Sequence, residues 1–178
     1  MNDDRYFAFL RAINTGTRRL SNEQLLAPFE AMGFGDVAAY QAAGNVTFRS
    51  DAPADERAIE AVLATAYGFE TPTFVRSTAE LAALVAAEPF TPEAVAATAG
   101  KVQVAFLRVA PSDRQRHAVA ELVPDEDQVR MIGREWYWLP VEGISASKLP
   151  VGQIEGVLGE MTIRTLGTVQ RILAKFAD

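Results

Sequence analysis

The tetrapeptide AFLR occurs twice in this sequence, and the repetition constrains the fold more than any other feature. The copies lie in YFAFLRAINTG (6–16) and VQVAFLRVAPS (102–112), and they are 97 positions apart. Each copy is a short apolar run that ends on an arginine, Arg11 or Arg108, and such runs are typical of strands buried on both faces. The repetition therefore predicts two sheets that each contain one such central strand.

The segments that follow the two copies predict the same order of elements. Three Ser-x-x-Gln/Glu capping boxes begin predicted helices, at residues 21–24, 77–80 and 112–115. Two glycine-containing pairs, Gly44-Asn45 and Gly133-Arg134, predict tight hairpin turns between strands. Each half of the chain thus predicts the order βαββαβ, which is the ferredoxin-like type of split βαβ motif.

We therefore expect an α+β protein in which two ferredoxin-like (βαββαβ) units in tandem pack together, with extra connector and C-terminal helices. The predicted boundaries are residues 1–76 for the first unit, 77–100 for a helical connector, and 101–178 for the second unit with its C-terminal helix. A sheet of this type covers one face with its own helices. Its second face should be covered by the other half or by the connector helices.

The composition narrows the possible chemistry. The sequence has no cysteine and one histidine, His117, which excludes thiolate sites and metal centres that need two imidazoles. We therefore predict no metal and no cofactor. The net charge of −6 argues against a nucleic-acid partner. The sequence has no apolar run that would span a bilayer and no leader pattern at its start, so we expect a soluble, cytoplasmic protein with no membrane contact.

Arg11 and Arg108 each stand at the end of a predicted central strand, and two interpretations are open for them. Each arginine could simply reach solvent or pair with a carboxylate. Alternatively it could bind an anion, and the first copy favours this because Asn14, Gly16 and Arg18 follow it, in a loop that ends at a predicted helix N-cap. Glycine allows backbone N–H groups to turn toward a ligand, and guanidinium groups match carboxylates and phosphates.

Several motifs together resemble the DUF1697 family of uncharacterised bacterial proteins. The segments are YFAFLRAINTG, GFGDVAAYQAAGNVTF (33–48), SKLP (147–150) and TIRTLGTV (162–169). The family pattern resembles Y-x-A-L-L-R-G-I-N-V-G-G, then Y-x-x-S-G-N-V-x-F, then S-K with T-x-R-N-W-N-T-V. This sequence departs from it at four places: Ala12 and Thr17 replace glycines, Ala43 replaces a serine, and residues 165–167 replace Asn-Trp-Asn. The resemblance supports the fold and the location of a site, and implies no known activity.

Polar residues that match this pattern at both ends of the chain predict a shared pocket. We expect Arg11, Asn14, Asn45, Lys148 and Arg164 to converge where the two units meet. The complete set of predicted ligand-binding residues is Arg11, Asn14, Gly16, Arg18, Gly44, Asn45, Ser147, Lys148 and Arg164. The leading hypothesis is a binding module for a small anionic ligand, phosphorylated or carboxylated.

Two further hypotheses remain open at this stage. The same pocket could serve an enzyme, with Lys148 or Tyr40 as acid or base, although no catalytic residue can be assigned. The second is an interaction of a sheet face with RNA or a protein, for which Trp136 and Trp138 could supply stacking surfaces. Core packing of these indoles is the competing interpretation, and His117 is expected on a solvated helix face. An oligomer is possible, with no state assigned.

Overall fold

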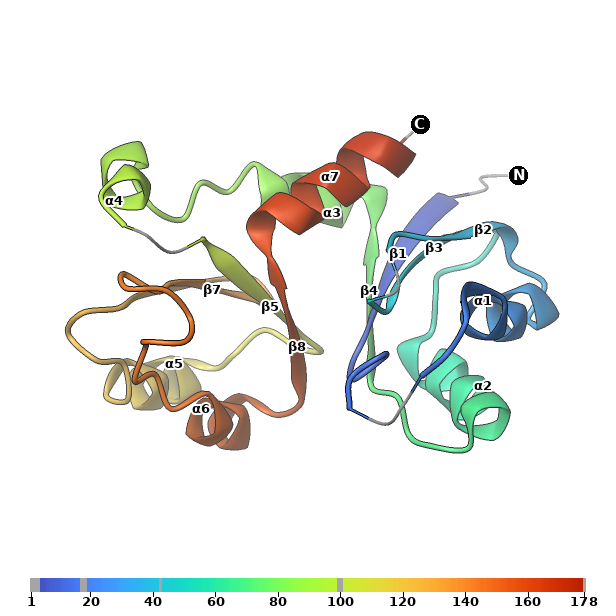
Figure 1. The fold of residues 1–178 in the computed structure, drawn as a ribbon, viewed down its shortest axis with the longest axis horizontal. Helices are drawn as coiled ribbons and strands as arrows, with labels where there is room; N and C mark the ends of the chain where they lie inside the picture. Colours follow the sequence, from blue (N-terminus) through green and yellow to red (C-terminus); the bar gives the residue numbers. More distant parts are fainter. Residues whose placement is uncertain (1–3, 17–18, 42, 99–100, 178) are drawn as a thin grey trace. The chain divides into compact units, whose positions relative to one another are not determined.

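The computed structural model describes residues 4–16, 19–41, 43–98 and 101–177, and the chain divides into two compact units (Figure 1). Unit 1 comprises residues 1–82 with 172–178, and unit 2 comprises residues 83–171. The described ranges contain helices and two four-stranded antiparallel sheets, one in each unit, so the protein is α+β.

The sheet of unit 1 has the strand order β2-β3-β1-β4. Its strands are β1 (Asp4–Leu10), β2 (Gly35–Ala39), β3 (Asn45–Ser50) and β4 (Thr73–Ser77). The helices α1 (Asn22–Ala31) and α2 (Glu56–Tyr67) cover one face of this sheet (Figure 1). The hydroxyl of Tyr67 donates to the carbonyl of Leu25 at 2.7 Å and so ties α2 to α1.

The sheet of unit 2 has the corresponding order β6-β7-β5-β8. Its strands are β5 (Gln103–Leu107), β6 (Gln128–Ile132), β7 (Glu135–Leu139) and β8 (Met161–Thr165). The helices α5 (Asp113–Ala120) and α6 (Val151–Leu158) cover one face. The two AFLR copies therefore begin in inner strands, β1 and β5, that occupy the same place in their sheets.

The last strand of each sheet runs directly into a further helix. β4 leads into α3 (Thr78–Val85), and β8 leads into α7 (Leu166–Phe176), while α4 (Pro92–Ala96) lies between α3 and β5. Ser77 and Thr165 begin these helices with side-chain hydrogen bonds, from Glu80 N–H at 3.2 Å and from Thr168 N–H at 3.3 Å. The predicted capping boxes at 21–24, 77–80 and 112–115 are all formed.

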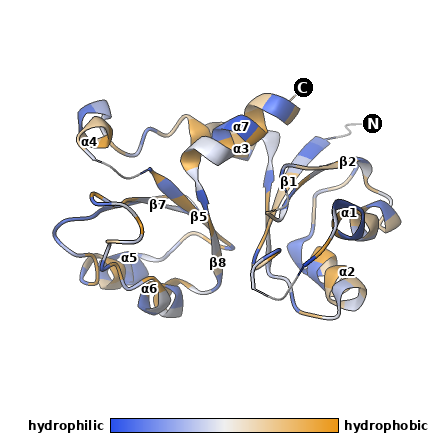
Figure 2. Cartoon of the chain, in the orientation of Figure 1, coloured by the Kyte–Doolittle hydropathy of each residue, from blue (hydrophilic) through white to orange (hydrophobic). Residues whose placement is uncertain are grey.

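Each unit has its own apolar core between the sheet and its two covering helices. In unit 1 the residues at the centre of the core include Leu10, Phe29 and Leu63, all essentially inaccessible to solvent. In unit 2 they include Leu107, Trp136 and Ile154. Hydrophobic and hydrophilic residues both occur along α2 (Figure 2), as expected for a helix with one buried side.

The second face of each sheet also buries apolar side chains, beside polar ones such as Arg76 and Thr162. Phe7, Phe9 and Phe74 lie on this face in unit 1, and Val104 and Phe106 lie on it in unit 2. In unit 2 the hydroxyl of the buried Tyr137 donates to the carbonyl of Leu84 in α3 at 3.0 Å. Leu84 of α3 thus contacts the face of the unit 2 sheet that α5 and α6 leave open.

One of the two predicted hairpin turns is right and the other is wrong. β6 and β7 are joined by Gly133 and Arg134, with Ile132 opposite Glu135, as expected. In unit 1 the connection between β2 and β3 extends over residues 40–44, and Asn45 is already the first residue of β3. Gly44 is therefore the end of a longer loop, and its role is a close approach to another segment rather than a two-residue turn.

The edge strands β2 and β6, which are equivalent in the two strand orders, are built differently. In β2 the register shifts between Gly35 and Ala38, with Asp36 at φ 44°. This is a bulge, and Asp36 is bonded there to the guanidinium of Arg5. β6 has an uninterrupted register over residues 128–132. Bulges and charges of this kind hinder pairing with other strands. β2 has both, whereas β6 keeps a regular register and is the edge that is more open to pairing.

The edge strand β4 is protected by carboxylates. The N–H groups of Thr73, Val75 and Ser77 donate to the carboxylates of Glu60 (2.7 Å), Glu56 (2.7 Å) and Glu80 (2.9 Å). These bonds satisfy donors that a free edge would offer to another chain.

Among the helices of the described ranges, none has both the length and the apolar character needed to cross a bilayer.

Candidate functional site

The backbone of residues 11–16, which we name the first loop, has an unusual conformation. Ala12, Asn14 and Gly16 each have φ 57°, whereas Ile13 and Thr15 between them are not among the described residues with positive φ. A left-handed backbone is accessible to glycine and often to asparagine, but for alanine it costs roughly 1–2 kcal/mol. Strain of this kind persists where the surrounding structure enforces it.

The first loop is held by its neighbours on two sides. The N–H of Leu10 donates to the carbonyl of Gly44 at 2.7 Å, and the N–H of Arg11 donates to that of Pro72 at 2.9 Å. A Cβ atom at Gly44 would lie 2.9 Å from the Leu10 oxygen and 3.0 Å from Cβ of Ile13. Glycine is thus required at position 44, because the loop passes directly against its backbone.

Asn14 and Arg19 organise this loop internally. The side-chain oxygen of Asn14 accepts from the N–H of Leu20 at 2.7 Å, and Nη1 of Arg19 donates to the Asn14 carbonyl at 3.0 Å. Asn14, a predicted ligand-binding residue, therefore shapes the loop. Arg18, another predicted site residue, lies outside the described residues.

Asn45 is buried in β3, where it lies opposite Phe9 of β1. Its Nδ2 donates to the carbonyl of Tyr40 at 3.2 Å, and the N–H of Tyr40 donates to the Asn45 carbonyl at 2.9 Å. Asn45 thus closes the connection between β2 and β3. Tyr40 is half-buried, with Nζ of Lys175 at 5.9 Å from its ring centroid.

In unit 2 the predicted site residue Ser147 belongs to a cluster around a buried carboxylate. Its hydroxyl is bonded to Asp127 and accepts from the N–H of Leu149 at 3.0 Å. Asp127 also accepts from Nε1 of Trp138 at 2.9 Å and from the N–H of Val141 at 3.3 Å. The cluster fixes the segment after β7, and the neighbouring Lys148 is exposed.

The predicted site residue Arg164 lies in β8 and faces the second side of its sheet, opposite Val104. Its Nη1 donates to the Thr162 hydroxyl and the Ile163 carbonyl, both at 2.9 Å. Burial lowers the pKa of this guanidinium to about 10, so it stays charged at neutral pH. Arg108, which follows the second AFLR strand, is 3.5 Å from the carboxylate of Glu160. Carboxylate pairing, the simpler of the two interpretations, therefore holds for Arg108.

The structure brings together two of the sequence motifs within unit 1. The first loop and Gly44, predicted from separate segments, are in direct contact. Ser147, Lys148 and Arg164 belong to unit 2, and the convergence of the two sets stays a prediction.

Sequence reasoning assigned no role to Asp127, since the segment PDEDQ (124–128) is predicted to be a loop. The signal for its role would have been its position. Asp127 stands directly before the strand that pairs with the one carrying Trp136 and Trp138.

The surroundings of Trp136, Trp138 and His117 indicate structural roles for these residues. Trp136 and Trp138 are buried in the core of unit 2, with ring centroids 6.4 Å apart and planes 3° from parallel. These rings do not form the exposed stacking surface that an RNA-binding sheet requires. His117 is exposed on α5, 3.5 Å from Glu121. Within the described ranges no group of three or more His, Asp or Glu side chains could hold a metal ion.

Comparisons with known proteins give a family and a structural relative. The family model DUF1697, described as a protein of unknown function, matches residues 4–137. The chain is similar in structure to a conserved bacterial protein from Streptococcus pneumoniae, with a TM-score of 0.77 and 20% sequence identity over 99% of each chain. This likeness shows the fold. No curated protein matches the chain.

Proposed function

The chain belongs to the DUF1697 family of proteins of unknown function, and on that premise we propose that it binds a small anionic ligand, phosphorylated or carboxylated, at the first loop. The single observation that carries this proposal is the alternation of φ along residues 12–16. We infer a right-handed conformation for Ile13 and Thr15, and a backbone that alternates between left- and right-handed conformations turns successive N–H groups toward one concave side. Such concavities, known as nests, are common anion-binding sites in proteins.

The hydrogen bonding of the first loop agrees with this proposal. The N–H groups of Ala12, Ile13, Thr15 and Gly16 donate no hydrogen bond to any residue in the described ranges. Thr15 and Gly16 are exposed, so their N–H groups can reach a ligand from solvent. An anion is the ligand that compensates several donors at once.

The charges around the first loop favour the same ligand. Arg11 begins the loop, and Arg19 is bonded to the carbonyl of Asn14. Helix α1 begins shortly after the loop, at the N-cap Ser21, and the N-terminal end of a helix favours negative charge. These cations are local, since the chain as a whole carries a net charge of −6.

The same proposal extends to the architecture of the two units. We infer that each unit is ferredoxin-like and that the halves are an internal repeat. The corresponding strand orders support this, as do Arg76 and Arg164, which lie opposite Phe7 and Val104 at equivalent positions. Each guanidinium donates to the carbonyl of the residue before it, at 2.8 Å and 2.9 Å. The cytoplasm is the location that goes with this proposal.

The proposal is tested by titrating ¹⁵N-labelled protein with inorganic phosphate and with citrate, following backbone amide shifts by NMR. The amides of residues 12–16 should shift together and saturate. Binding should also raise the melting temperature, because a ligand at 100 times its Kd stabilises the native state by about 2.7 kcal/mol. Shifts confined to other segments would contradict the proposal.

A matched pair of variants separates binding from stability. Gly16→Val should abolish the phosphate response, because a β-branched residue cannot hold φ 57° and the alternation is lost. Gly143→Val is the control, since Gly143 also has positive φ, 89°, and its Cβ would likewise meet no described atom within 4 Å. The control should lose comparable stability and keep the response. Equal loss of binding in both variants would refute the assignment to the first loop.

A further inference from the structure

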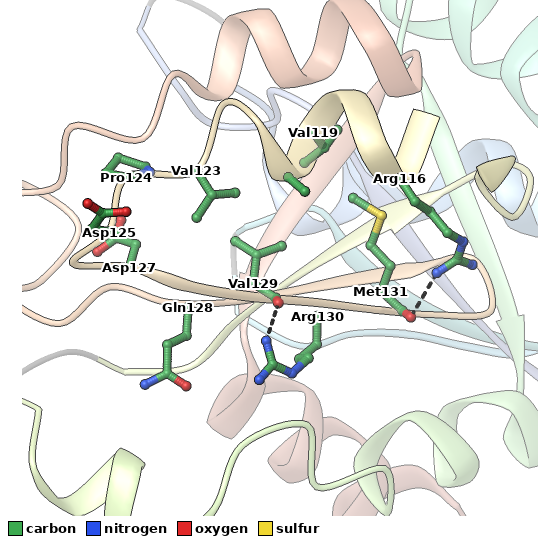
Figure 3. A pocket seen from close by; sticks show the side chains of 11 residues that line it. Arg116, Val119, Val123, Pro124, Asp125, Asp127, Gln128, Val129, Arg130 and Met131 are labelled. Atoms are coloured by element: carbon green, nitrogen blue, oxygen red, sulfur yellow. Dashed lines mark hydrogen bonds between the residues drawn. The ribbon is translucent and has the colours of Figure 1, made fainter. Parts of the chain in front are cut away.

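A groove runs along one edge of the unit 2 sheet, between helix α5 and the edge strand β6 (Figure 3). Its volume is about 470 Å³. Four consecutive strand residues, 128–131, line it together with residues from α5 and the segment after it. Since consecutive residues of a strand point to opposite faces, a groove that all four line must follow the edge of the strand itself.

The register of the hairpin determines which backbone groups of β6 face this groove. Ile132 and Glu135 flank the two-residue turn, so they form a hydrogen-bonded pair. Such pairs recur at every second residue, and Arg130 therefore also bonds toward β7. The backbone groups of Val129 and Met131 point away from the sheet, into the groove.

The outward carbonyls of this edge are already occupied by arginines. Nη1 of Arg130 donates to the Val129 carbonyl at 2.9 Å, and Nη1 of Arg116 donates to the Met131 carbonyl at 3.0 Å (Figure 3). The N–H groups of Val129 and Met131 donate to no residue in the part of the chain that the structure describes. This edge thus presents N–H donors and guanidinium groups, which are the groups that a partner rich in acceptors requires.

The groove also has an apolar floor. Val119 from α5 is buried, and Val123, Val129 and Met131 are partly buried against the core of unit 2. A strand that adds to a sheet edge points every second side chain toward such a floor and the others toward solvent. The groove therefore matches a segment with alternating apolar and polar residues.

We propose that this groove binds an extended acidic peptide segment of another protein, which adds to β6 as a fifth strand of the unit 2 sheet. Carbonyls of the peptide accept from the N–H groups of Val129 and Met131, and its apolar side chains cover the groove floor. Its carboxylates pair with Arg130 on the side away from the floor and, at the end of the groove, with Arg116. Asp125 lies at the end of the groove opposite Arg116 (Figure 3), so the acidic residues lie toward Arg116.

The edge carbonyls distinguish this occupant from a second copy of the chain. Antiparallel pairing of β6 with its own copy would set its outward N–H groups against the carbonyls of Val129 and Met131, which Arg130 and Arg116 already occupy. A separate peptide supplies free carbonyls for these N–H groups and carboxylates for the two arginines. This site is in unit 2 and shares no residue with the first loop, so either proposal can fail without the other.

The test measures fluorescence polarisation with a fluorescein-labelled peptide of alternating glutamate and valine, as long as β6. A peptide of alternating lysine and valine is the control. The glutamate peptide should bind, and the lysine peptide should bind at least about tenfold more weakly, because charge-assisted hydrogen bonds are lost. Equal binding of the two peptides would overturn the proposal.

Two variants locate the binding site. Arg116→Gln should weaken binding about tenfold. Arg114→Gln, a change at an exposed position of the same helix, should alter it by less than about twofold. Met131→Pro should abolish binding, because proline removes the outward N–H while the bonds to β7 are unaffected at this edge position.

Two further measurements keep the outcome decisive if Met131→Pro fails to fold. In wild-type protein the amides of Val129 and Met131 should shift on addition of the glutamate peptide, and unchanged amides would overturn the proposal. Sedimentation of the free protein should show no dimer that depends on Arg116. A dimer that Arg116→Gln strengthens would identify a second copy as the occupant and overturn it as well.

Discussion

The two units share one strand order but differ in how the chain leaves the first strand. After β1, the first loop contains three residues at φ 57°, two of which are not glycine. After β5, the shorter connection of residues 108–112 contains no positive φ among its described residues, and its Arg108 is paired with Glu160. The same AFLR strand thus precedes a strained loop in unit 1 and a relaxed one in unit 2. The comparison teaches that strand topology alone does not require the strain.

The edge strands β2 and β6 differ in the opposite sense. Unit 1 has a bulged edge that is blocked by Asp36, whereas unit 2 has a regular edge beside a groove. Each unit therefore has one feature that its counterpart lacks. Unit 1 has a loop with N–H groups that donate to no described residue, and unit 2 has a strand edge with such groups. We expect three pairs of substitutions and one single substitution to break or sharpen this comparison.

The largest effect is expected at Gly44. Gly44→Ala should destabilise the protein by about 3 kcal/mol, because it adds left-handed strain to a collision with the Leu10 carbonyl and Ile13. Gly133→Ala, at φ 58° in the unit 2 turn, should cost about 1 kcal/mol, since its Cβ meets just the end of the Glu135 side chain at 3.4 Å. Urea denaturation measures both. Equal losses would show that the first loop does not require the close approach.

The next effect concerns Asp127 in unit 2. Asp127→Asn should cost about 2 kcal/mol, because the buried carboxylate that accepts from Trp138, Ser147 and Val141 is replaced by an amide with its own donors. Asp125→Asn is the control, at an exposed position of the same loop, and should change stability by less than about 0.5 kcal/mol. A negligible loss for Asp127→Asn would mean that the segment after β7 is held by other contacts.

A gain of stability is expected at Ala12. Ala12→Gly should stabilise the protein by about 1 kcal/mol, because it relieves the left-handed strain at φ 57° at some cost in backbone entropy. Ala110→Gly in unit 2 should instead destabilise it by up to about 1 kcal/mol, since no strain is relieved there. Thermal melting of the two variants gives the sign directly. Destabilisation by both would argue against strain in the first loop.

The smallest effect is the pH dependence of the contact between Arg5 and Asp36. The hydrogen bond and the charge of Arg5 lower the pKa of Asp36, so this contact stabilises the fold above the unfolded pKa and is lost as pH falls through the folded value. The Asp36 side chain is 62% exposed, and the contribution should stay below about 1 kcal/mol. Asp36→Asn should remove this acid-dependent part, measured by urea denaturation from pH 6 to pH 2. An unchanged pH profile would show that the contact adds nothing to stability.

The sequence predicted the elements well, because their signals are local. The capping boxes and the Gly133-Arg134 turn are decided by residues within four positions of each other, and all of them formed. The Gly44-Asn45 turn failed because the glycine there is needed by a distant segment, Leu10 to Ile13, which no local pattern reveals. Tertiary contact took precedence over turn propensity at this position.

The candidate site was predicted in part. Asn14 and Gly16 were chosen for their chemistry, and the structure gives them positive φ, which asparagine and glycine tolerate best. Ala12 could not be chosen in this way, since alanine has no preference for that conformation, although the glycine in the family pattern was a hint. The groove beside β6 was missed because it depends on the register of an edge strand and on Arg116, which the sequence places on an ordinary helix face.

The stacked indoles of β7 give one unit of this protein its own fluorescence signal. The sequence contains two tryptophans, Trp136 and Trp138, and both are buried in unit 2. Tryptophan emission is therefore an intrinsic optical reporter of unit 2 alone, while far-ultraviolet circular dichroism records the backbone of both units. Denaturation curves from the two signals coincide if the units unfold cooperatively and separate if they do not.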